Sequence, residues 1–236
     1  MRVEIVSHCY SVRMREYAHY LNYQLSSLVL HKPQCEISTC VCIDSTDAYT
    51  LKFIDWFKEN TDLNIRVLSL STDQMSWRAI GRNEAALSTK ADIVWFSDCD
   101  QVYRDGVLDK LSEREWPENK TLIYPHRVMI NTNYEYGDRS VENIKEPCLV
   151  DIDTKEFKMR GYRKPIGGVQ IVKGDHAREH GYLKDNEKYM VPFGKPFDKH
   201  CRDDTIYRKQ TGDEFIQAIR LPGVYRMRHT ECGVGD

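Results

Sequence analysis

Two aspartates follow directly on a short apolar run, and their types and spacing are the first sign of chemistry in this sequence. Residues 93–96 are Ile-Val-Trp-Phe, and Asp98 and Asp100 come soon after, with one cysteine between them. An apolar run of this length is typical of a strand that is buried on both faces. Ligands of open α/β sheets bind at the carboxyl ends of strands, and divalent cations bridge carboxylates to phosphates. The triplet therefore predicts a metal–diphosphate site; the competing interpretation is an ordinary turn, where aspartate is also common.

The chain before this triplet alternates between strand and helix patterns. Three further apolar runs have the composition of strands, and they occupy residues 3–6, 37–43 and 65–70. Each is followed by a helical pattern; the first has a one-sided apolar stripe over 14–28, and the last spans 75–90, directly before the strand that ends in Asp98. The order β-α-β-α-β-α-β indicates parallel strands joined by right-handed crossovers. The predicted fold class is therefore α/β, with helices covering a central, mostly parallel sheet.

The second half of the chain has a weaker pattern. Asp105 is expected to cap a short helix, and a brief strand is expected at 121–124. Residues 125–165 are polar, rich in aromatic side chains and weakly periodic, which favours an irregular segment that faces a substrate or a mobile surface loop. The remaining expected elements are a glycine-led strand at 167–172, a helix that ends at Gly181, a loop at 185–201, a helix capped by Asp203 or Asp204, and a strand at 215–225 broken by Pro222.

The charge balance argues against some classes of partner. Thirty-four basic and thirty-six acidic residues among 236 give a net charge of −2. A chain without a basic excess has no global field for nucleic acid, so no nucleic-acid partner is expected and any anion site must be local. The 41% of hydrophobic residues is enough for the core of one compact α/β domain.

The cysteines and the first residues bear on the compartment. The eight cysteines include no C-x-x-C pair, and the N-terminal residues run straight into the first predicted strand, which leaves no room for a signal peptide. No apolar run approaches the roughly 18 residues that a membrane-spanning helix needs. We therefore expect a cytoplasmic protein with reduced thiols and no transmembrane segment.

Five further motifs accompany the triplet along nearly the whole chain. In order they are IVSHCY at residues 5–10, CIDSTD at 42–47, RNEA at 82–85, GGVQ at 167–170 and CRDDTIYR at 201–208. Together with the aspartate triplet, they resemble the GT-A nucleotide-sugar glycosyltransferases, most closely the inverting glycosyltransferase family 2. The resemblance implies a single GT-A domain over 1–236, with a nucleotide-binding half at 1–104 and an acceptor-binding and catalytic-base half at 105–236.

The first three motifs imply contacts to the nucleotide. IVSHCY is similar to the family's opening nucleotide-binding loop and implies a role for Ser7. CIDSTD is similar to the family's D-D-G-S-T-D turn, whose aspartate accepts a hydrogen bond from uracil; the turn is one residue shorter here, and Asp44 is preferred over Asp47. RNEA looks like the family's R-N-x-A/G helix, whose arginine faces the nucleotide. Arg82 therefore takes that role, and Arg78 lies one turn earlier on the same helix face.

The triplet and the end of the chain imply a cation site. The triplet falls where the family has its metal-binding D-x-D, so the resemblance implies that Asp100 contacts Mn²⁺ or Mg²⁺ directly, while Asp98 binds it through water or holds the ribose. His229 resembles a late histidine that completes the metal shell or donates to the diphosphate. Arg226 and Arg228 beside it either flank the phosphates or form a solvated edge.

The glycine-led GGVQ motif is similar to the family's strand beside the acceptor, and CRDDTIYR resembles the E-D-T-x-x-x-R motif that supplies the catalytic base. Asp203 replaces the glutamate here, so the role of base falls on Asp204, with Asp203 as its competitor. A helix start also favours a plain N-cap at this position.

The resemblance implies a metal-dependent, inverting glycosyltransferase that moves a hexose from a UDP-sugar to a hydroxyl acceptor such as a sugar or glycan. A nucleotidyltransferase is the first alternative, but it would carry a glycine-rich basic loop after the first strand, and residues 7–15 contain no glycine. The second alternative is an inactive nucleotide- or sugar-binding module, which the presence of Asp98, Asp100 and Asp204 disfavours. The Q-x-x-R-W motif of processive synthases is absent, which argues against a polymerising enzyme.

Overall fold

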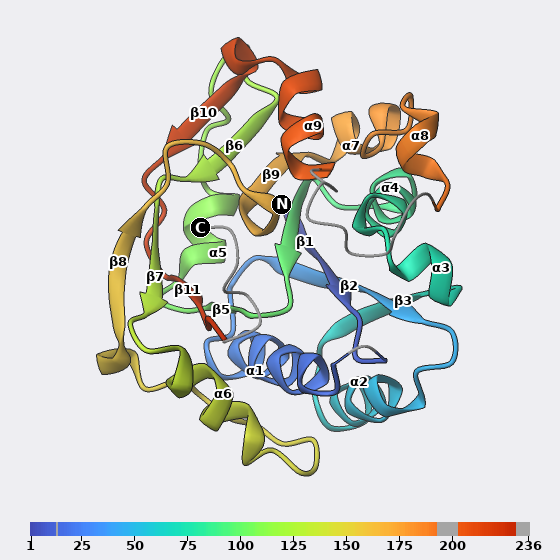
Figure 1. Ribbon diagram of the computed structural model, residues 1–236. Helices are drawn as coiled ribbons and strands as arrows, with labels where there is room; N and C mark the ends of the chain where they lie inside the picture. Colours follow the sequence, from blue (N-terminus) through green and yellow to red (C-terminus); the bar gives the residue numbers. More distant parts are fainter. Residues whose placement is uncertain (13, 193–202, 230–236) are drawn as a thin grey trace.

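The apolar run at 93–96 lies within strand β4 (Ile93–Asp98), which is buried up to its last residue. The computed structural model, which describes residues 1–12, 14–192 and 203–229, places β4 in the middle of a seven-stranded sheet of order β10-β6-β9-β4-β1-β2-β3 (Figure 1). Three strands on one side run parallel to β4; they are β1 (Arg2–Cys9), β2 (Glu36–Asp44) and β3 (Asn64–Leu70). The predicted α/β class, with a mostly parallel central sheet flanked by helices, is confirmed.

The other side of β4 is built from the second half of the chain. Strand β9 (Gln170–Lys173) runs antiparallel to β4 and to β6 (Leu122–Pro125), and β10 (Ile216–Ile219) runs parallel to β6. The two halves predicted from the sequence therefore share one sheet.

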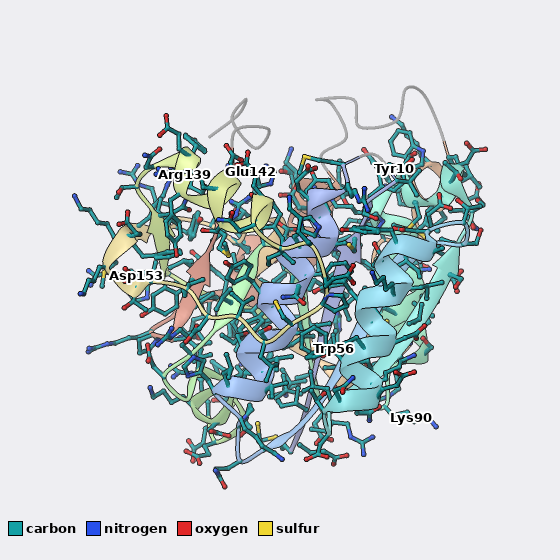
Figure 2. All side chains as sticks on the ribbon, turned by 90° about the horizontal axis from the view of Figure 1, so that it is seen from below. Tyr10, Trp56, Lys90, Arg139, Glu142 and Asp153 are labelled. Carbon is teal, nitrogen blue, oxygen red and sulfur yellow. The ribbon has the colours of Figure 1, made fainter. Side chains whose placement is uncertain are left out.

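The register brings the carboxyl ends of β1, β2 and β4 to one edge of the sheet. His8 on β1 lies between Asp98 on β4 and Cys42 on β2. In Figure 2, Tyr10, which directly follows β1, lies at the upper edge of the molecule, whereas Lys90, shortly before β4, lies at the lower edge. The upper edge is thus the carboxyl edge, where open α/β sheets bind their ligands.

Helices cover both faces of the parallel part of the sheet. On one face, α1 (Glu16–Leu30) and α2 (Ala48–Asn60) pack against β1 and β2 in one apolar cluster, which includes Leu21, Phe53, Phe57, Val41 and Ile43. On the other face, α4 (Arg78–Ser88) approaches β2 so closely that a Cβ on Gly81 would lie 3.0 Å from Cys42 Sγ. Side chains that alternate along β1 and β2 therefore meet different helices.

A smaller, four-stranded sheet has the order β5-β11-β7-β8. Its strands are β5 (Gln101–Tyr103), β7 (Arg127–Asn131), β8 (Phe157–Gly161) and β11 (Val224–Arg226). Strand β5 follows the aspartate triplet directly and pairs antiparallel with β11, so that Gln101 lies opposite Arg226. This pairing brings the end of the described chain to the aspartate triplet.

The remaining helices are α5 (Val107–Ser112), α6 (Tyr134–Glu142), α7 (Gly174–His180), α8 (Glu187–Met190) and α9 (Asp203–Thr211), with single 3₁₀ turns at Thr154–Glu156, Gly167–Val169 and Asp213–Phe215. Helix α7 ends at Gly181, as predicted, with a φ of 61° that glycine adopts readily. Among the residues that the structure describes, no helix has both the length and the apolar character that a membrane span requires.

Two predicted helix starts are wrong. The helix expected at 75–90 is two helices, α3 (Thr72–Met75) and α4, because Ser71 and Gln74 form a capping box for the first and Trp77 has an extended backbone before the second. Asp105 does not cap α5: its own φ is 56°, and Gly106, with φ 67°, is the residue before the helix. The carboxylate of Asp105 instead accepts a hydrogen bond from Tyr225, 3.3 Å away.

The irregular segment predicted at 125–165 is also wrong, because it contains β7, α6 and β8. Each of these elements is short, so its period is weak in the sequence. The strand expected at 215–225 is two strands in different sheets, since the chain turns through Pro222 and Gly223, whose φ is 108°. Gly167 and Gly168 form a 3₁₀ turn before β9 rather than its first residues. Of the loop predicted at 185–201, residues 193–201 lie outside the described residues, and the described part contains α8.

Candidate active site

The carboxylate of Asp98, at the end of β4, is held by two arginines of α4. Its Oδ1 accepts hydrogen bonds from Arg82 Nη2 at 3.2 Å and Arg78 Nη1 at 3.4 Å. Burial disfavours the charged form, but the charges of these two arginines outweigh it and lower the pKa of Asp98. On its other side the carboxylate faces Gly168, where an added Cβ would lie 2.8 Å from Asp98 Oδ2. Asp98 is therefore an ionised, oriented carboxylate with one oxygen left for a ligand.

A buried polar network lies beneath Asp98, on the α1 side of the sheet. Gln24 of α1 accepts from Ser7 Oγ at 2.6 Å and donates to the backbone oxygen of Asp98 at 2.9 Å. Tyr103 OH donates to Ser97 Oγ at 2.7 Å, and Ser97 also receives a hydrogen bond from Gln24. Ser7 is completely buried and its hydroxyl is engaged by Gln24, so its side chain supports the strand end from below and does not face the carboxyl edge.

Asp100 is buried and only half satisfied. Its Oδ2 accepts from Arg226 Nε at 3.0 Å, and its backbone oxygen accepts from Met227 N at 2.8 Å. Its Oδ1 has no hydrogen-bond partner among the described residues. Burial, together with the neighbouring charge of Asp98, raises the pKa of Asp100. A buried anionic oxygen without a donor is a position that a cation can fill.

Residues 226–229 form a segment across the edge of the site that we call the C-terminal strap. Asn131 holds its backbone from both sides, because Asn131 Nδ2 donates to the carbonyl oxygen of Arg228 at 2.9 Å and Asn131 Oδ1 accepts from Arg228 N. The Arg228 guanidinium lies over the Tyr134 ring, 4.1 Å from its centre. Helix α6 packs so closely that a Cβ on Gly137 would lie 2.0 Å from the Arg228 carbonyl oxygen. The strap is therefore fixed by β7 and α6.

The strap also orients His229, which is 2% exposed. Its ring stacks on Tyr20 of α1 with 4.9 Å between ring centres, and it meets Tyr17 edge-on at 5.7 Å. The charge of His229 acts to lower the pKa of Asp100. The structure thus brings Asp98, Asp100 and His229 to one end of the site. No three His, Cys, Asp or Glu side chains within 1–12, 14–192 and 203–229 already converge on one metal position.

The two aspartates of the predicted base motif lie in the first turn of α9; the preceding Cys201 and Arg202 of the motif lie outside the described residues. Asp204 is partly exposed, and its Oδ2 accepts from Gly167 N at 3.1 Å. Asp203 is 1% exposed and pairs through Oδ1 with Arg78 Nη2 at 3.3 Å, while its Oδ2 has no hydrogen-bond partner among the described residues. Arg78 therefore lies between the aspartate triplet and α9, and the charge of Asp203 raises its pKa.

No protein-family model and no curated protein matches this chain. Solved structures do match its fold. S. aureus TarS 1-349 is 14% identical, with a TM-score of 0.58 over 96% of this chain and 60% of that one; the same protein in complex with UDP-GlcNAc gives a TM-score of 0.56 over 95% and 58%. The mannosyltransferase PcManGT from Pyrobaculum calidifontis, in complex with GDP-Man and Mn²⁺, is 14% identical with a TM-score of 0.58 over 95% and 56%. These are GT-A proteins.

The chain has the GT-A fold. The predicted resemblance is confirmed at the level of the fold, while membership of glycosyltransferase family 2 stays a prediction. The chain spans 60% or less of the length of the three structures described above.

The two aspartates of the CIDSTD motif, Asp44 and Asp47, have different surroundings. Asp47 is the N-cap of α2; it accepts from Thr50 N at 2.9 Å and from Thr50 Oγ1 at 2.7 Å, and Ser11 Oγ donates to it as well. Asp44 is the last residue of β2 and is completely buried. Burial acts to raise its pKa, but hydrogen bonds led by that of Thr46 lower it. Asp47 is occupied by capping. Asp44 is at the carboxyl edge beside β1, and its Oδ1 accepts from Thr46 N at 2.8 Å and Thr46 Oγ1 at 2.7 Å.

His8 also lies at the site, although no sequence motif indicates it. It lies beside Asp98 at the end of β1, is 8% exposed, and its Nε2 has no hydrogen-bond partner among the described residues. Burial, reinforced by the charges of Arg78 and Arg82, lowers the pKa of His8 to about 3, so the imidazole is neutral. The available signal is strand alternation. If the first strand continues past Val6, His8 and Ser7 face opposite sides of the sheet, and His8, which pairs with Asp98, faces the arginines of α4.

Unsatisfied buried atoms gather in this part of the GT-A fold. Four of the buried side-chain atoms without a hydrogen-bond partner among the described residues belong to this cluster: His8 Nε2, Arg82 Nε, Asp100 Oδ1 and Asp203 Oδ2. Native proteins pair the large majority of buried polar groups, so each exception calls for an explanation. A polar ligand that supplies the missing partners is such an explanation, and it marks the carboxyl edge as a binding site.

Proposed function

We propose that this protein is a metal-dependent glycosyltransferase that transfers a hexose from a UDP-sugar to a hydroxyl acceptor with inversion. The observation that carries the proposal is the cluster at the carboxyl edge of the GT-A sheet, where Asp98, Asp100 and Asp203 meet three arginines and several buried atoms lack partners. Two of the matching structures support this class of activity, because one holds UDP-GlcNAc and the other is a mannosyltransferase with GDP-Man and Mn²⁺.

The nucleotide would lie along the carboxyl ends of β2, β1 and β4. Asp44 is the better candidate than Asp47 for the nucleobase, since Asp47 is engaged as a helix cap. Arg78 and Arg82 offer positive charge to the diphosphate from α4, and Arg228 offers it from the strap. Ser7 contributes from beneath the site, through Gln24, because its hydroxyl does not face the ligand. We propose a UDP-sugar as the donor and a sugar or glycan hydroxyl as the acceptor; the UDP-GlcNAc complex among the matching structures supports the donor.

The residues present fit a divalent cation. Asp100 has a buried oxygen without a donor, Asp98 keeps one carboxylate oxygen outside its arginine contacts, and His229 lies close enough to act on the charge of Asp100. These three would hold Mn²⁺ or Mg²⁺, and the other ligands would be diphosphate oxygens and water. A bound cation neutralises the charge that develops on the departing diphosphate.

We assign the catalytic base to Asp204. A base must reach the acceptor hydroxyl, and Asp204 is partly exposed with a carboxylate oriented by Gly167 N. Asp203 is almost completely buried against Arg78, so its role is to position that arginine. In an inverting displacement Asp204 takes the proton of the hydroxyl as the oxygen attacks the anomeric carbon, and the nucleoside diphosphate leaves from the opposite side.

We further propose that residues 1–236 act as one GT-A domain, with the nucleotide half at 1–104 and the acceptor half at 105–236. The shared central sheet supports this, because β9 of the second half pairs with β4 of the first. The cytoplasmic location remains a prediction; the cysteines in the described part of the chain are free, which is consistent with it.

The test is release of nucleoside diphosphate from UDP-glucose, UDP-galactose, UDP-GlcNAc and GDP-mannose, with Mn²⁺ and with EDTA. We expect Mn²⁺-dependent release from at least one UDP-sugar, with water as the acceptor when no sugar is added. Pyrophosphate formed from UTP and glucose 1-phosphate would instead identify a nucleotidyltransferase. Binding of UDP without turnover of any of the four donors would identify a binding module.

A further inference from the structure

We propose that Tyr182 and Gln170 are positioning residues, which tie the catalytic base Asp204 to the donor-binding carboxylate Asp98 through Arg82. We call this chain of contacts the Arg82–Tyr182–Gln170 bridge. It rests on the proposed function, since it explains how the base and the donor site of that same centre keep their relative positions. Neither Tyr182 nor Gln170 contacts the reacting atoms.

The bridge is an unbroken series of hydrogen bonds. Arg82 Nη2 lies 3.2 Å from Asp98 Oδ1, and Arg82 Nη1 lies 3.2 Å from Tyr182 OH. Tyr182 OH lies 3.0 Å from Gln170 Oε1, and Gln170 Nε2 lies 3.1 Å from the backbone oxygen of Asp204. The three linking side chains are buried: Arg82 is 1% exposed, and Tyr182 and Gln170 are 0% exposed.

The donors and acceptors fix the direction of the bridge. A guanidinium can only donate, so Tyr182 accepts from Arg82 and has its single hydroxyl proton left to give. That proton goes to Gln170 Oε1, which turns the amide nitrogen of Gln170 toward the carbonyl of Asp204. The amide orientation of Gln170 therefore depends on Tyr182, and the backbone contact at Asp204 depends on that orientation.

The turn at residues 167–170 holds Asp204 at two points, its carboxylate and its backbone oxygen. Gly167 N donates to the carboxylate of Asp204, and Gln170, three residues later, donates to its backbone oxygen. Between them, Gly168 packs against the Asp98 carboxylate, and its carbonyl oxygen accepts from Trp95 Nε1 at 3.1 Å. Residues 167–170 thus lie between the Asp98 carboxylate and Asp204, and the bridge contacts this turn from the α4 side.

Tyr207 provides a matched control. Its ring stacks on Tyr182 with 4.2 Å between ring centres, so both tyrosines have similar surroundings. Both are buried, but the Tyr207 hydroxyl has no hydrogen-bond partner among the described residues. Tyr182→Phe breaks two links of the bridge, whereas Tyr207→Phe removes an oxygen that makes no hydrogen bond within the described part of the chain.

The experiment measures nucleoside diphosphate release in the presence of Mn²⁺, and the affinity for UDP by titration calorimetry. Tyr182→Phe should lower kcat by about tenfold to hundredfold, the loss expected when a reacting group is misplaced. Its KM for the nucleotide sugar and its Kd for UDP should stay within about twofold of the wild-type values, because Arg82 keeps its contact to Asp98. Tyr207→Phe should match the wild type in all three. Gln170→Met, which removes the contact to Asp204 without burying a charge, should reproduce the kcat loss if Tyr182→Phe does not fold.

The outcomes distinguish a failure of the bridge from a failure of the proposed function. If the wild type turns over a nucleotide sugar and both Tyr182→Phe and Gln170→Met keep its kcat, the bridge is overturned and the proposed function stands. A loss of UDP affinity equal to the loss of kcat would also overturn it, because that result indicates a general structural role. If the wild type neither binds UDP nor turns over any of the four donors, the proposed function falls and the bridge falls with it.

Discussion

Arg226 Nε lies 3.0 Å from Oδ2 of Asp100, while Oδ1 of the same carboxylate is buried without a hydrogen-bond partner among the described residues. The pairing of β5 with β11 creates this relationship, because it places the C-terminal strap next to the residues that follow β4. In the proposed function, Asp100 Oδ1 would hold the cation, while Arg226 would remain on Oδ2.

The first prediction concerns this oxygen. Mn²⁺ and UDP together should raise the melting temperature of the wild type by more than the sum of their separate effects, and Asp100→Asn should abolish the extra shift. A ligand at about one hundred times its Kd stabilises the folded state by ~2.7 kcal/mol, which is roughly 5–10 °C for a chain of this length. Differential scanning fluorimetry measures the shift. Asp62→Asn, at a side chain that is 92% exposed, is the control and should behave as the wild type does. An unchanged joint shift in Asp100→Asn would remove Asp100 from the metal site.

The second prediction separates the two aspartates of α9. Asp204→Asn should retain UDP binding and lose transfer by about 10²- to 10⁴-fold, the usual contribution of a general base. Asp203→Asn should instead lower the melting temperature and weaken UDP binding, since it removes the buried negative charge that Arg78 pairs with. Transfer assays and calorimetry on the same two variants check both statements. Full transfer activity in Asp204→Asn would move the role of base to another residue.

The alternation of strands and helices in the first half of the chain, and the place of the aspartate triplet at a strand end, were predictable because both leave local traces in the sequence. A strand buried on both faces must be a continuous apolar run, and residues 93–96 are one. The triplet interrupts that run at the carboxyl end, where the fold class itself places ligands. Helix α1 was equally visible from its apolar stripe over 14–28, although the helix is buried continuously from Ala18 to Leu28. The strands of the small sheet were not predictable, because they are short and pair with strands that lie far away in the sequence.

The supporting residues of the site were missed for a different reason. The apolar run predicts a first strand that ends at Val6, whereas β1 continues to Cys9. Successive residues of a strand face opposite sides, so this extension turns Ser7 toward Gln24 of α1 and His8 toward the arginines of α4. Tyr182 is identified only by contacts to residues 12 and 100 positions away. Such contacts depend on tertiary packing and leave no local pattern.

The third prediction uses the neutral state of His8. Unfolded histidine gains a proton near pH 6.5, while the folded protein keeps His8 uncharged down to a pKa of about 3. The unfolded state therefore binds more protons between these values, and the protein should lose about 1.4 kcal/mol of stability per pH unit as the pH falls through this window. Above pH 6.5 this contribution should not vary.

Urea unfolding at pH 7, 6 and 5 without added metal measures the slope. Between pH 6 and 5, the unfolding free energy of His8→Gln should fall by ~1.4 kcal/mol less than that of the wild type, because the variant lacks this one proton-binding group. The same slope in His8→Gln as in the wild type would show that His8 is not held neutral.

The fourth prediction tests whether α6 positions the C-terminal strap. In the middle of an exposed helix, Gly→Ala is normally stabilising by ~1 kcal/mol. At Gly137, however, the new Cβ would lie 2.0 Å from the Arg228 carbonyl oxygen, so the strap or the helix must shift. We expect Gly137→Ala to weaken UDP binding in Mn²⁺ by about tenfold or more, since the strap carries Arg226, Arg228 and His229. Gly161→Ala on β8 is the matched control, because its nearest contact would be His126 O at 3.9 Å. Titration calorimetry compares the two, and wild-type affinity in a folded Gly137→Ala would mean that the ligand does not depend on the position of the strap.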